Sequence, residues 1–492
     1  MKELNNASLP LSFAEGKYSS ESVRLPKGQY IIKIIATGPC IGKVLKDNEV
    51  LTEVDFSHIL KPNALYRDLQ ISFILALESD ISLEVTPKRE DVKVSAKIYS
   101  SILPIGKGEE PQPPTPVKKT CKFIMKETGD FTITQEGTGS YYLKTNGGDW
   151  EEYSATATIS VTEGDEIELK SEVDITPVYT NGTVYIRTLS FKDNPIEFEI
   201  EGDIIGTLYL DNYLYTGSCF EMFKNCTGLK KMPNLIIKAL SDHACASMFE
   251  GCTSLIEVSS LPNIFVQDSS YVRMFYGCTS LVTAPELPAT ILGNSSYSSM
   301  FSGCTSLTIA PELPATILGK QCYSAMFYGC TGLITAPELP ATTLVVSCYQ
   351  YMFYGCTSLV TAPELPATTL VSSCYSHMFD GCTGLTSAPE LPATTLVDNC
   401  YEGMFQRCSS LTTAPELPAT TLVSGCYSYM FRYCTLLNYI KCLSSVSGTN
   451  TYTRDWVKDV SATGTFVKNS STSWSTGYYG IPYDWTVENA AA

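Results

Sequence analysis

The hydrophobic positions of this chain follow two different patterns. Before about residue 197, short runs of β-branched and aromatic residues alternate with turn-forming Gly, Asn and Asp, as in residues 29–35, 140–144 and 157–161. This spacing predicts short strands and favours small β-sandwiches. From about residue 219, the hydrophobic residues instead recur with one fixed period of 26 residues. Such a period predicts a repeat architecture.

The pair Met-Phe marks the repeat. It begins at nine positions, each 26 residues after the last: 222, 248, 274, 300, 326, 352, 378, 404 and 430. A Cys stands three residues after every Phe, and a Leu stands three residues after that Cys. Six central copies continue with Ala-Pro-Glu-Leu-Pro, the first beginning at Ala284 and the last at Ala414. A period without insertions means that each turn of the chain returns to the same place.

The inward positions of such an array form ladders of identical side chains, because each coil covers the apolar face of the next. In a central copy, we expect Met352, Phe353, Cys356 and Leu359 to be these structural ladder positions. Phe, Met and Leu fill the interior. Cys serves as a small apolar filler where a larger side chain would clash.

Each repeat is expected to hold one short helix and one strand. Cys348 and Met352 are four residues apart, a spacing that places side chains on one face of a helical turn, and Gly355 is a natural C-terminal stop. The Thr-Ser-Leu segment then opens an extended piece, which the two prolines of Pro-Glu-Leu-Pro end. The sequence therefore predicts a mainly β fold with short helices, namely a leucine-rich-repeat-type solenoid of nine 26-residue coils preceded by two small β-sandwich-like domains.

The repeat, Met-Phe-x-Gly-Cys-Thr-Ser-Leu followed by a Leu-Pro segment, resembles the BspA-like leucine-rich repeats of bacterial surface proteins. The resemblance covers about residues 196–442, and the first two copies depart from the pattern as an atypical end would. Residues 198–204 look like the short strands that precede such arrays. The tail at 464–468 and 480–487 is similar to the endings of such proteins in gut Bacteroides and their phages. The family implies surface adhesion or display and offers no catalytic residues to carry over.

Changes in composition predict five segments. Residues 106–118 hold four prolines among charged residues and are expected to form a semi-extended linker. The linker separates an anchoring N-terminal β domain, 1–105, from a small β-sandwich, 119–197. The repeat array is expected at 198–442. Residues 443–492 contain three of the four tryptophans and are expected to close the open end of the array.

Composition disfavours several classes of protein. The formal charge of −17 argues against nucleic-acid binding, which needs Lys and Arg to displace counterions. A membrane span is not expected, because the chain has no run of about 18 apolar residues. A signal peptide is not expected either, because no continuous apolar stretch follows Met1. Of the 19 cysteines, only Cys40 and Cys121 lie before residue 219, and almost all the others recur with the repeat; the total is odd and no CxxC pair occurs. We therefore expect reduced thiols rather than a disulfide framework or a zinc site.

The search for catalytic motifs favours a protein that is not an enzyme. Residues 38–44 are one residue short of a phosphate-binding loop and end in Val. Cys374 and His377 are a candidate nucleophile pair, but this Cys position recurs in five copies and the His in one. A ladder cysteine beside a variable surface histidine is the favoured interpretation. We accordingly expect no catalytic residue, no cofactor and no metal ion.

One polar ladder accompanies the prolines. It consists of six glutamates at equivalent positions: Glu286, Glu312, Glu338, Glu364, Glu390 and Glu416. Neighbouring carboxylates about 5 Å apart repel by about 1 kcal/mol in water. We favour solvated carboxylates, or carboxylates that bond turn N–H groups, over a surface stripe that takes up cations or a basic partner. Tyr pairs such as Tyr351 and Tyr354 are likewise expected to be packed ridges rather than a glycan-binding surface, although exposed Tyr suits sugar contacts.

These features favour a virion structural or display protein, a phage head or tail fibre or decoration protein, at the virion surface. It would present the solenoid for adhesion to a host surface, a glycan or mucus. The expected partners are a capsid or tail protein at the N-terminal domain, a host surface protein or glycan at the solenoid, and further copies in a dimer or trimer. The alternative is a bacterial cell-surface adhesin, which the missing export signal disfavours. An enzyme with an appended repeat is the least favoured hypothesis.

Overall fold

The structure is a computed structural model of the 492-residue chain. Within residues 2–100 it describes the strands, by their backbone alone. Beyond them it describes residues 120–137, 139–172, 176–180, 183–209, 213–214, 216–237, 239–261 and 266–491. In this second set, residues 176–180, 183–187, 213 and 239 are described by their backbone alone. The chain divides into two compact units, Met1–Pro116 and Val117–Ala492. The predicted linker at 106–118 lies outside the described residues.

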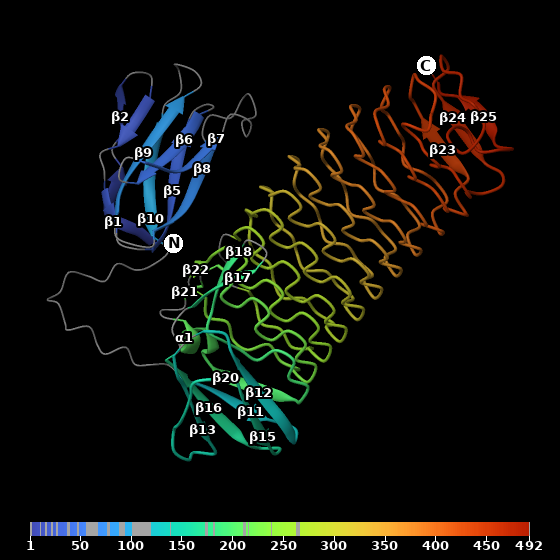
Figure 1. The fold of residues 1–492 in the computed structure, drawn as a ribbon. Helices are drawn as coiled ribbons and strands as arrows, with labels where there is room; N and C mark the ends of the chain where they lie inside the picture. Colours follow the sequence, from blue (N-terminus) through green and yellow to red (C-terminus); the bar gives the residue numbers. More distant parts are fainter. Residues whose placement is uncertain are drawn as a thin grey trace. The chain divides into compact units, whose positions relative to one another are not determined.

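The first unit contains two antiparallel sheets, shown in blue in Figure 1. One sheet has the order β1-β10-β5-β8 and the other has the order β2-β3-β9-β6-β7, with β4 also paired to β9. Their bounds are β1 (Lys2–Leu9), β2 (Leu11–Ala14), β3 (Lys17–Ser20), β4 (Val23–Leu25), β5 (Gly28–Ala36), β6 (Cys40–Lys46), β7 (Glu49–Asp55), β8 (Arg67–Leu75), β9 (Ser79–Pro87) and β10 (Val94–Ser100). The β-rich character predicted for this segment is present, and its packing as a sandwich stays a prediction.

The second unit begins with a β domain. A five-stranded sheet has the order β14-β13-β16-β11-β20, a three-stranded sheet has the order β15-β12-β19, and β17 pairs with β18. Their bounds are β11 (Cys121–Met125), β12 (Gly129–Gln135), β13 (Tyr141–Thr145), β14 (Glu151–Tyr153), β15 (Ala157–Val161), β16 (Glu166–Ser171), β17 (Thr176–Thr180), β18 (Thr183–Arg187), β19 (Leu189–Ser190) and β20 (Phe198–Gly202). Alternate residues of β11 are buried, as expected for a strand with one face on a core.

A continuous apolar core joins this domain to the repeats. Phe123 packs against Phe131 and Phe191, with ring centroids 5.2 and 4.8 Å apart. Phe191 stacks in turn on Phe223 of the first repeat, at 5.4 Å. Strand β20, expected to introduce the array, pairs instead with β11 in the five-stranded sheet. The predicted boundary between residues 197 and 198 thus falls inside one packed unit.

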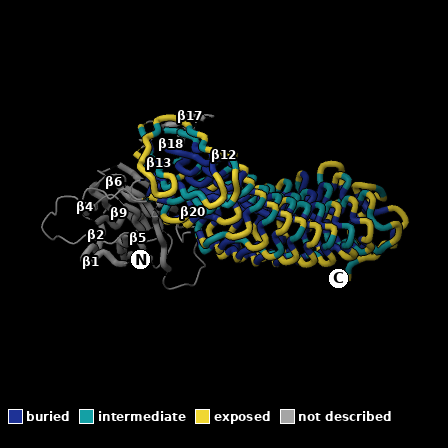
Figure 2. The backbone as a smooth tube through the Cα atoms, turned by 90° about the horizontal axis from the view of Figure 1, so that it is seen from below, coloured by how far each residue is buried: buried dark blue, intermediate teal, exposed yellow. Residues whose placement is uncertain are grey.

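The repeats lie one on the next (Figure 1), and their equivalent aromatic side chains stack in register. Phenylalanines 26 residues apart stack with centroid separations of 5.4–5.9 Å from Phe223 to Phe431. A second stack of tyrosines runs from Tyr271 to Tyr427 at 5.8–6.2 Å. The predicted ladder residues Met352, Phe353, Cys356 and Leu359 are fully buried. Figure 2 shows the buried backbone on the inside of the array and the exposed backbone at its outer bends.

The short helix predicted for each repeat is wrong. The segment around Met-Phe is a chain of turns in which every fourth residue has positive φ, as at Ser347, Tyr351 and Gly355 with φ of 54°, 57° and 69°. Alternate N–H groups bond within the turn and to the next repeat: Met352 N–H donates to Tyr349 at 3.2 Å, and Phe353 N–H donates to Met378 at 2.9 Å. Stacking gives half of the N–H groups a partner outside their own repeat, so a helix is not needed to satisfy them.

The strand predicted for each central repeat is reduced to isolated bridges. Thr361 pairs with Ser387, and Thr343 with Thr369, all in parallel. Within one repeat, Pro363 lies between the bridge positions Thr361 and Thr369. Because proline has no N–H to donate, a continuous ladder of backbone hydrogen bonds cannot pass through it. The other described elements near the array are α1 (Ile204–Leu208), β21 (Tyr213–Leu214), β22 (Ala239–Leu240), β23 (Tyr439–Cys442), β24 (Thr465–Lys468) and β25 (Thr486–Asn489).

The C-terminal segment covers the last repeat. Strands β23, β24 and β25 form a parallel sheet. Trp456 stands 26 residues after Met430, where a further repeat would have its Met. Its ring lies 6.2 Å from the ring of Tyr427 and 5.7 Å from that of Trp474. Trp456 is fully buried, so a large aromatic residue takes the place that another repeat would fill.

Candidate functional site

Among the positions that vary within otherwise similar repeats, three lie next to Met-Phe. We call them the variable ridge: the residue before Met-Phe and the first and second residues after it. The residues before are Glu221, Ser247, Arg273, Ser299, Ala325, Tyr351, His377, Gly403 and Tyr429. The first residues after are Lys224, Glu250, Tyr276, Ser302, Tyr328, Tyr354, Asp380, Gln406 and Arg432. The second are Asn225, glycine in the next six copies, then Arg407 and Tyr433.

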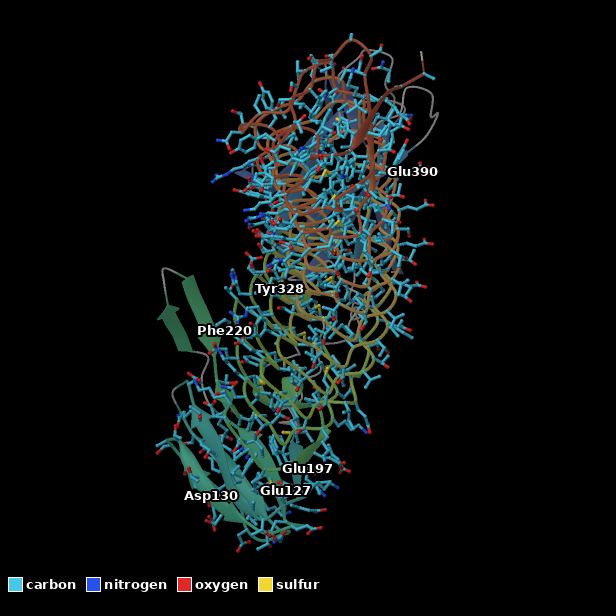
Figure 3. All side chains as sticks on the ribbon, turned by 90° about the vertical axis from the view of Figure 1, so that its right-hand side faces the viewer. Glu127, Asp130, Glu197, Phe220, Tyr328 and Glu390 are labelled. Atoms are coloured by element: carbon cyan, nitrogen blue, oxygen red, sulfur yellow. The ribbon has the colours of Figure 1, made fainter. Side chains whose placement is uncertain are left out.

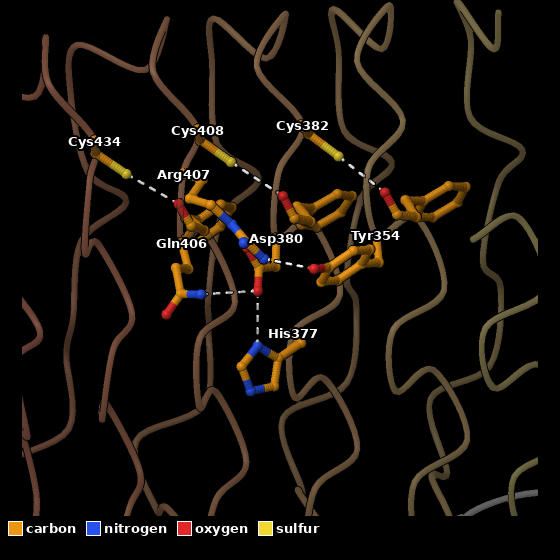
Figure 4. A network of polar contacts seen from close by, with 11 residues as sticks. Tyr354, His377, Asp380, Cys382, Gln406, Arg407, Cys408 and Cys434 are labelled. Carbon is orange, nitrogen blue, oxygen red and sulfur yellow. Dashed lines mark hydrogen bonds and ion pairs between the residues drawn. The ribbon is translucent and has the colours of Figure 1, made fainter. Parts of the chain in front are cut away.

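The ridge brings residues of consecutive repeats together around Asp380, whose side chain is 1% exposed (Figure 4). Arg407 Nε donates to Asp380 Oδ1 at 2.9 Å, and Gln406 Nε2 donates to Oδ2 at 3.1 Å. His377 Nδ1 lies 3.0 Å from Oδ2. These contacts compensate the cost of burying a carboxylate and hold the Arg407 guanidinium, which is 44% exposed.

Aromatic rings line the same ridge. Tyr328 stacks on Tyr354 at 4.4 Å, and Tyr351 stacks on His377 at 5.0 Å. Arg407 donates to the Tyr354 hydroxyl at 2.6 Å and lies 5.3 Å from its ring centroid. Guanidinium groups favour this placement over an aromatic face. Tyr328 is 39% exposed, so the ridge presents tyrosine to solvent.

Further guanidiniums lie against ridge tyrosines. Arg273 is 4.2 Å from the Tyr276 ring. Arg432 is 5.5 Å from the Tyr429 ring and 4.7 Å from the Tyr433 ring. Tyr and Arg are the residues most enriched in the energetic centres of protein interfaces. The ridge therefore has the composition of a recognition surface.

The comparisons with known proteins identify the repeats. Residues 219–333 and 320–454 match the family model described as BspA type Leucine rich repeat region, in six copies. Residues 219–454 carry BspA-type leucine-rich repeats. The resemblance inferred from the repeat residues is thereby confirmed for this stretch. Comparison with curated proteins and with solved structures gave no match.

The cysteines of the BspA-type repeats do more than fill space. All nine that follow Met-Phe donate their S–H to the Phe carbonyl one repeat earlier, or to the Phe191 carbonyl for the first, at 2.9–3.2 Å, as Cys356 does to Phe327. Burial raises the pKa of the Cys330 thiol to about 12. The 18 cysteines that the structure describes are buried and unbridged, while Cys40 has no described side chain.

The candidate pair Cys374–His377 does not form a nucleophile with its base. Burial raises the pKa of Cys374 to about 11, so its thiol stays protonated near neutral pH. The His377 ring bonds to Asp380 and stacks on Tyr351. Within residues 120–491, as far as they are described, no group of three or more His, Cys, Asp or Glu is arranged to hold a metal ion. No described helix is long and apolar enough to cross a membrane.

The glutamate ladder lies away from the ridge. All six of its members are exposed: Glu286, Glu312, Glu338, Glu364, Glu390 and Glu416. The last pairs with Lys441 at 2.9 Å. Shallow grooves of about 490 and 410 Å³ run between the proline-rich segments of neighbouring repeats, with Glu312 in both. In Figure 3, the labelled Tyr328 and Glu390 lie toward different edges of the array. Exposure agrees with the solvated interpretation, which stays a prediction.

The ridge is the feature that sequence reasoning missed. Tyr351 and Tyr354 are half-buried and packed on ridge neighbours, as expected, yet they belong to a surface that also holds Arg407 and Asp380. The available signal was variation: residues differ between nearly identical copies at the ridge positions, although they also differ at others, such as that of Asn294, Lys320 and Val346.

Proposed function

We propose that this chain is a non-catalytic display protein in which the BspA-type repeats form a nine-coil solenoid and present the variable ridge to a partner. The main support is the contrast inside each repeat, where ladder residues are uniform and ridge residues differ. Folding demands the ladder, since each coil packs on a copy of itself. Folding makes no such demand on the ridge, so its tyrosines and arginines point to recognition.

The absence of catalysis, cofactor and metal is part of this proposal. Support comes from the chemical state of the nucleophilic groups. The ladder thiols are buried and have raised pKa values, whereas a reactive cysteine needs a lowered pKa and access to substrate. Asp380 is occupied by three protein donors, which suits a structural carboxylate better than a catalytic one.

The proposal also covers the particle or cell on whose surface the protein is displayed. In the first version, the chain is a phage head or tail fibre or decoration protein at the virion surface. Its N-terminal β domain, 1–105, docks on a capsid or tail protein, and the solenoid meets a host surface protein or glycan. A dimer or trimer suits such a fibre. In the alternative, the chain is a bacterial cell-surface adhesin of gut Bacteroides, and the BspA-type repeats fit both equally.

Immunogold electron microscopy with an antibody to the repeats tests the proposal. Display predicts gold on the outside of purified phage particles or, in the alternative, on the outside of intact cells that carry the gene. Gold on particles selects the virion version, and gold on cells selects the adhesin. Labelling that appears only after cells are permeabilised, with none on particles, contradicts display in either form.

A further inference from the structure

The C-terminal end of the variable ridge holds two guanidiniums on one tyrosine. Arg432 lies 5.5 Å and Arg454 lies 5.6 Å from the Tyr429 ring centroid. Arg432 also donates to the Tyr433 hydroxyl at 3.0 Å. Because both lie within 5.6 Å of one ring centroid, the two guanidiniums are at most about 11 Å apart, and like charges at that range repel unless an anion offsets them.

Arg432 of the ridge and Arg454 of the coil that follows the last repeat differ from the ridge residues Arg273 and Arg407 in having no carboxylate partner. Arg273 pairs with Glu250 at 3.1 Å, and Arg407 pairs with Asp380 at 2.9 Å. Among the described residues, Arg432 and Arg454 form no ion pair, although Asp455 and Asp459 follow in the next coil. In a chain with a formal charge of −17, two guanidiniums without an ion pair at one tyrosine ring offer a local site for an anion.

The repeat itself does not need these residues. Gln406 stands at the position of Arg432 one repeat earlier, and Ser428 stands at the position of Arg454. Both neutral residues occur in coils with the same stacked interior. In addition, Arg432 Nε is buried without a hydrogen-bond partner, and a donor left unpaired costs stability. The packing of the repeat therefore does not explain either cation, and the unpaired Nε of Arg432 disfavours that residue structurally.

We propose that Arg432, Arg454, Tyr429 and Tyr433 bind the carboxylate of an acidic sugar within an otherwise neutral glycan. The planar guanidinium matches a carboxylate through two parallel N–H donors. Tyrosine offers an apolar ring and a hydroxyl to the sugar beside it. The inference rests on the proposed function, whose adhesion partner it specifies.

The density of charge favours a sparsely charged glycan over a uniform polyanion. Arg407 is already neutralised by Asp380, so unpaired charge is concentrated in one place on the ridge. A nucleic acid carries a phosphate at every nucleotide and gains its affinity from many cations. One carboxylate flanked by neutral sugars matches a single pair of arginines next to a row of tyrosines.

Calorimetric titration of the full chain with sialyllactose and with lactose tests the site. The two probes share their neutral sugars and differ by one carboxylate-bearing sugar. We expect sialyllactose to bind at least about tenfold more tightly than lactose, the factor of one charge-assisted hydrogen bond. Equal binding of the two probes, or binding of neither, overturns the inference.

Variants drawn from other repeats locate the binding. Arg432→Gln and Arg454→Ser copy residues of the preceding repeat, and each should weaken sialyllactose binding about tenfold or more. Arg273→Ser is the matched control: it removes the same charge from the ridge, copies Ser247 and Ser299, and should leave the affinity unchanged. Equal losses in all three variants, with folding preserved in circular dichroism, contradict a localised site.

Competition distinguishes the sources of the anion. Inorganic phosphate and a single-stranded DNA oligonucleotide should compete poorly at the concentration at which sialyllactose saturates the chain. Competition equal to that of sialyllactose makes the site a general anion site and overturns the sugar assignment. Surface labelling with gold but no sialyllactose binding removes this inference and leaves the proposed function intact. Sialyllactose binding without any gold on particles or intact cells supports the sugar site and removes the proposed display function.

Discussion

The interior ladders and the variable ridge come from the same repeats, yet packing places opposite demands on their residues. A ladder phenylalanine such as Phe353 has Phe327 and Phe379 as neighbours, at 5.6 Å on both sides. Any change there creates a mismatch with two neighbouring coils. A ridge residue such as Tyr328 faces solvent on its outer side and can change without disturbing the stack. The comparison teaches that stacking demands uniform residues at the buried ladder positions, whereas the ridge positions are free to vary and are available for recognition.

Alkaline pH should break the interior as a whole, which is the largest expected effect. Burial raises the pKa of Cys252 and Cys330 to about 12 and that of Cys374 to about 11, and it also raises the pKa of Tyr349. In the unfolded chain, thiols ionise near pH 8.5. The contribution of each group to stability is therefore complete below about pH 8.5 and is lost as the pH rises toward the folded pKa.

Each such group lowers the free energy of unfolding by about 1.4 kcal/mol for every pH unit between its unfolded and folded pKa. Because the array holds many such groups, we expect it to unfold between about pH 9 and about pH 11. Near-ultraviolet circular dichroism and tyrosinate absorbance, recorded with reductant present, measure it. An array that keeps its spectrum above about pH 11 shows that the thiols and phenols are less buried than described.

A single ladder substitution should have the next largest effect. Phe353 is fully buried between two other phenylalanines. Phe353→Ala should lower the free energy of unfolding by about 3–5 kcal/mol, because transfer and cavity costs add. Urea denaturation measures the change. A loss below about 1 kcal/mol indicates that the neighbouring coils close over the gap and that the stack is looser than the ring distances imply.

The ion pair of the ridge should be worth less, and its two partners should be coupled. Arg407→Gly leaves Asp380 buried without its guanidinium, whereas Asp380→Tyr with Arg407→Gly copies Tyr354 and Gly355. We expect the double variant to be about 2 kcal/mol more stable than Arg407→Gly alone, because it removes the unpaired buried charge. Denaturation of the wild type and all three variants completes the cycle. Additive changes mean that the pair is not coupled.

A buried hydroxyl should matter less still. Tyr349 is 1% exposed, and its hydroxyl has no hydrogen-bond partner. Tyr349→Phe should be neutral or stabilise the chain by up to about 1 kcal/mol, since it removes an unpaired polar group without changing the ring stack. Tyr271→Phe and Tyr323→Phe are useful parallels in thermal denaturation, because their hydroxyls are also buried without a partner. A destabilisation above about 1 kcal/mol reveals a buried water bonded to the hydroxyl.

The glutamate ladder should give the smallest effect. Glu364 is exposed and stands between equivalent glutamates of the neighbouring coils. Glu364→Ala should change the free energy of unfolding by less than about 0.5 kcal/mol, and in the stabilising direction at low salt because repulsion is relieved. Lys441→Gln removes the lysine that pairs with Glu416 and serves as a contrast. A larger loss for Glu364→Ala revives the hypothesis that the stripe binds cations.

Much of this protein is determined by the sequence alone. The 26-residue period, the positions buried in each copy, the BspA type of the repeats at 219–454 and the β-rich character of the N-terminal segments all follow from spacing and residue type. Spacing is sufficient because equivalent residues in a gapless repeat must stack on one another.

Tertiary structure decided the rest. The spacing of Cys348 and Met352 suits a helical turn, but their backbone follows consecutive turns, because the next coil supplies the hydrogen-bond partners that a helix would supply internally. The ridge depends on the same stacking: Asp380 and Arg407 are 27 residues apart and meet because their coils are adjacent. A contact between coils involves residues of two repeats, so the sequence of one repeat does not predict it. Only the assembled array shows which residues meet.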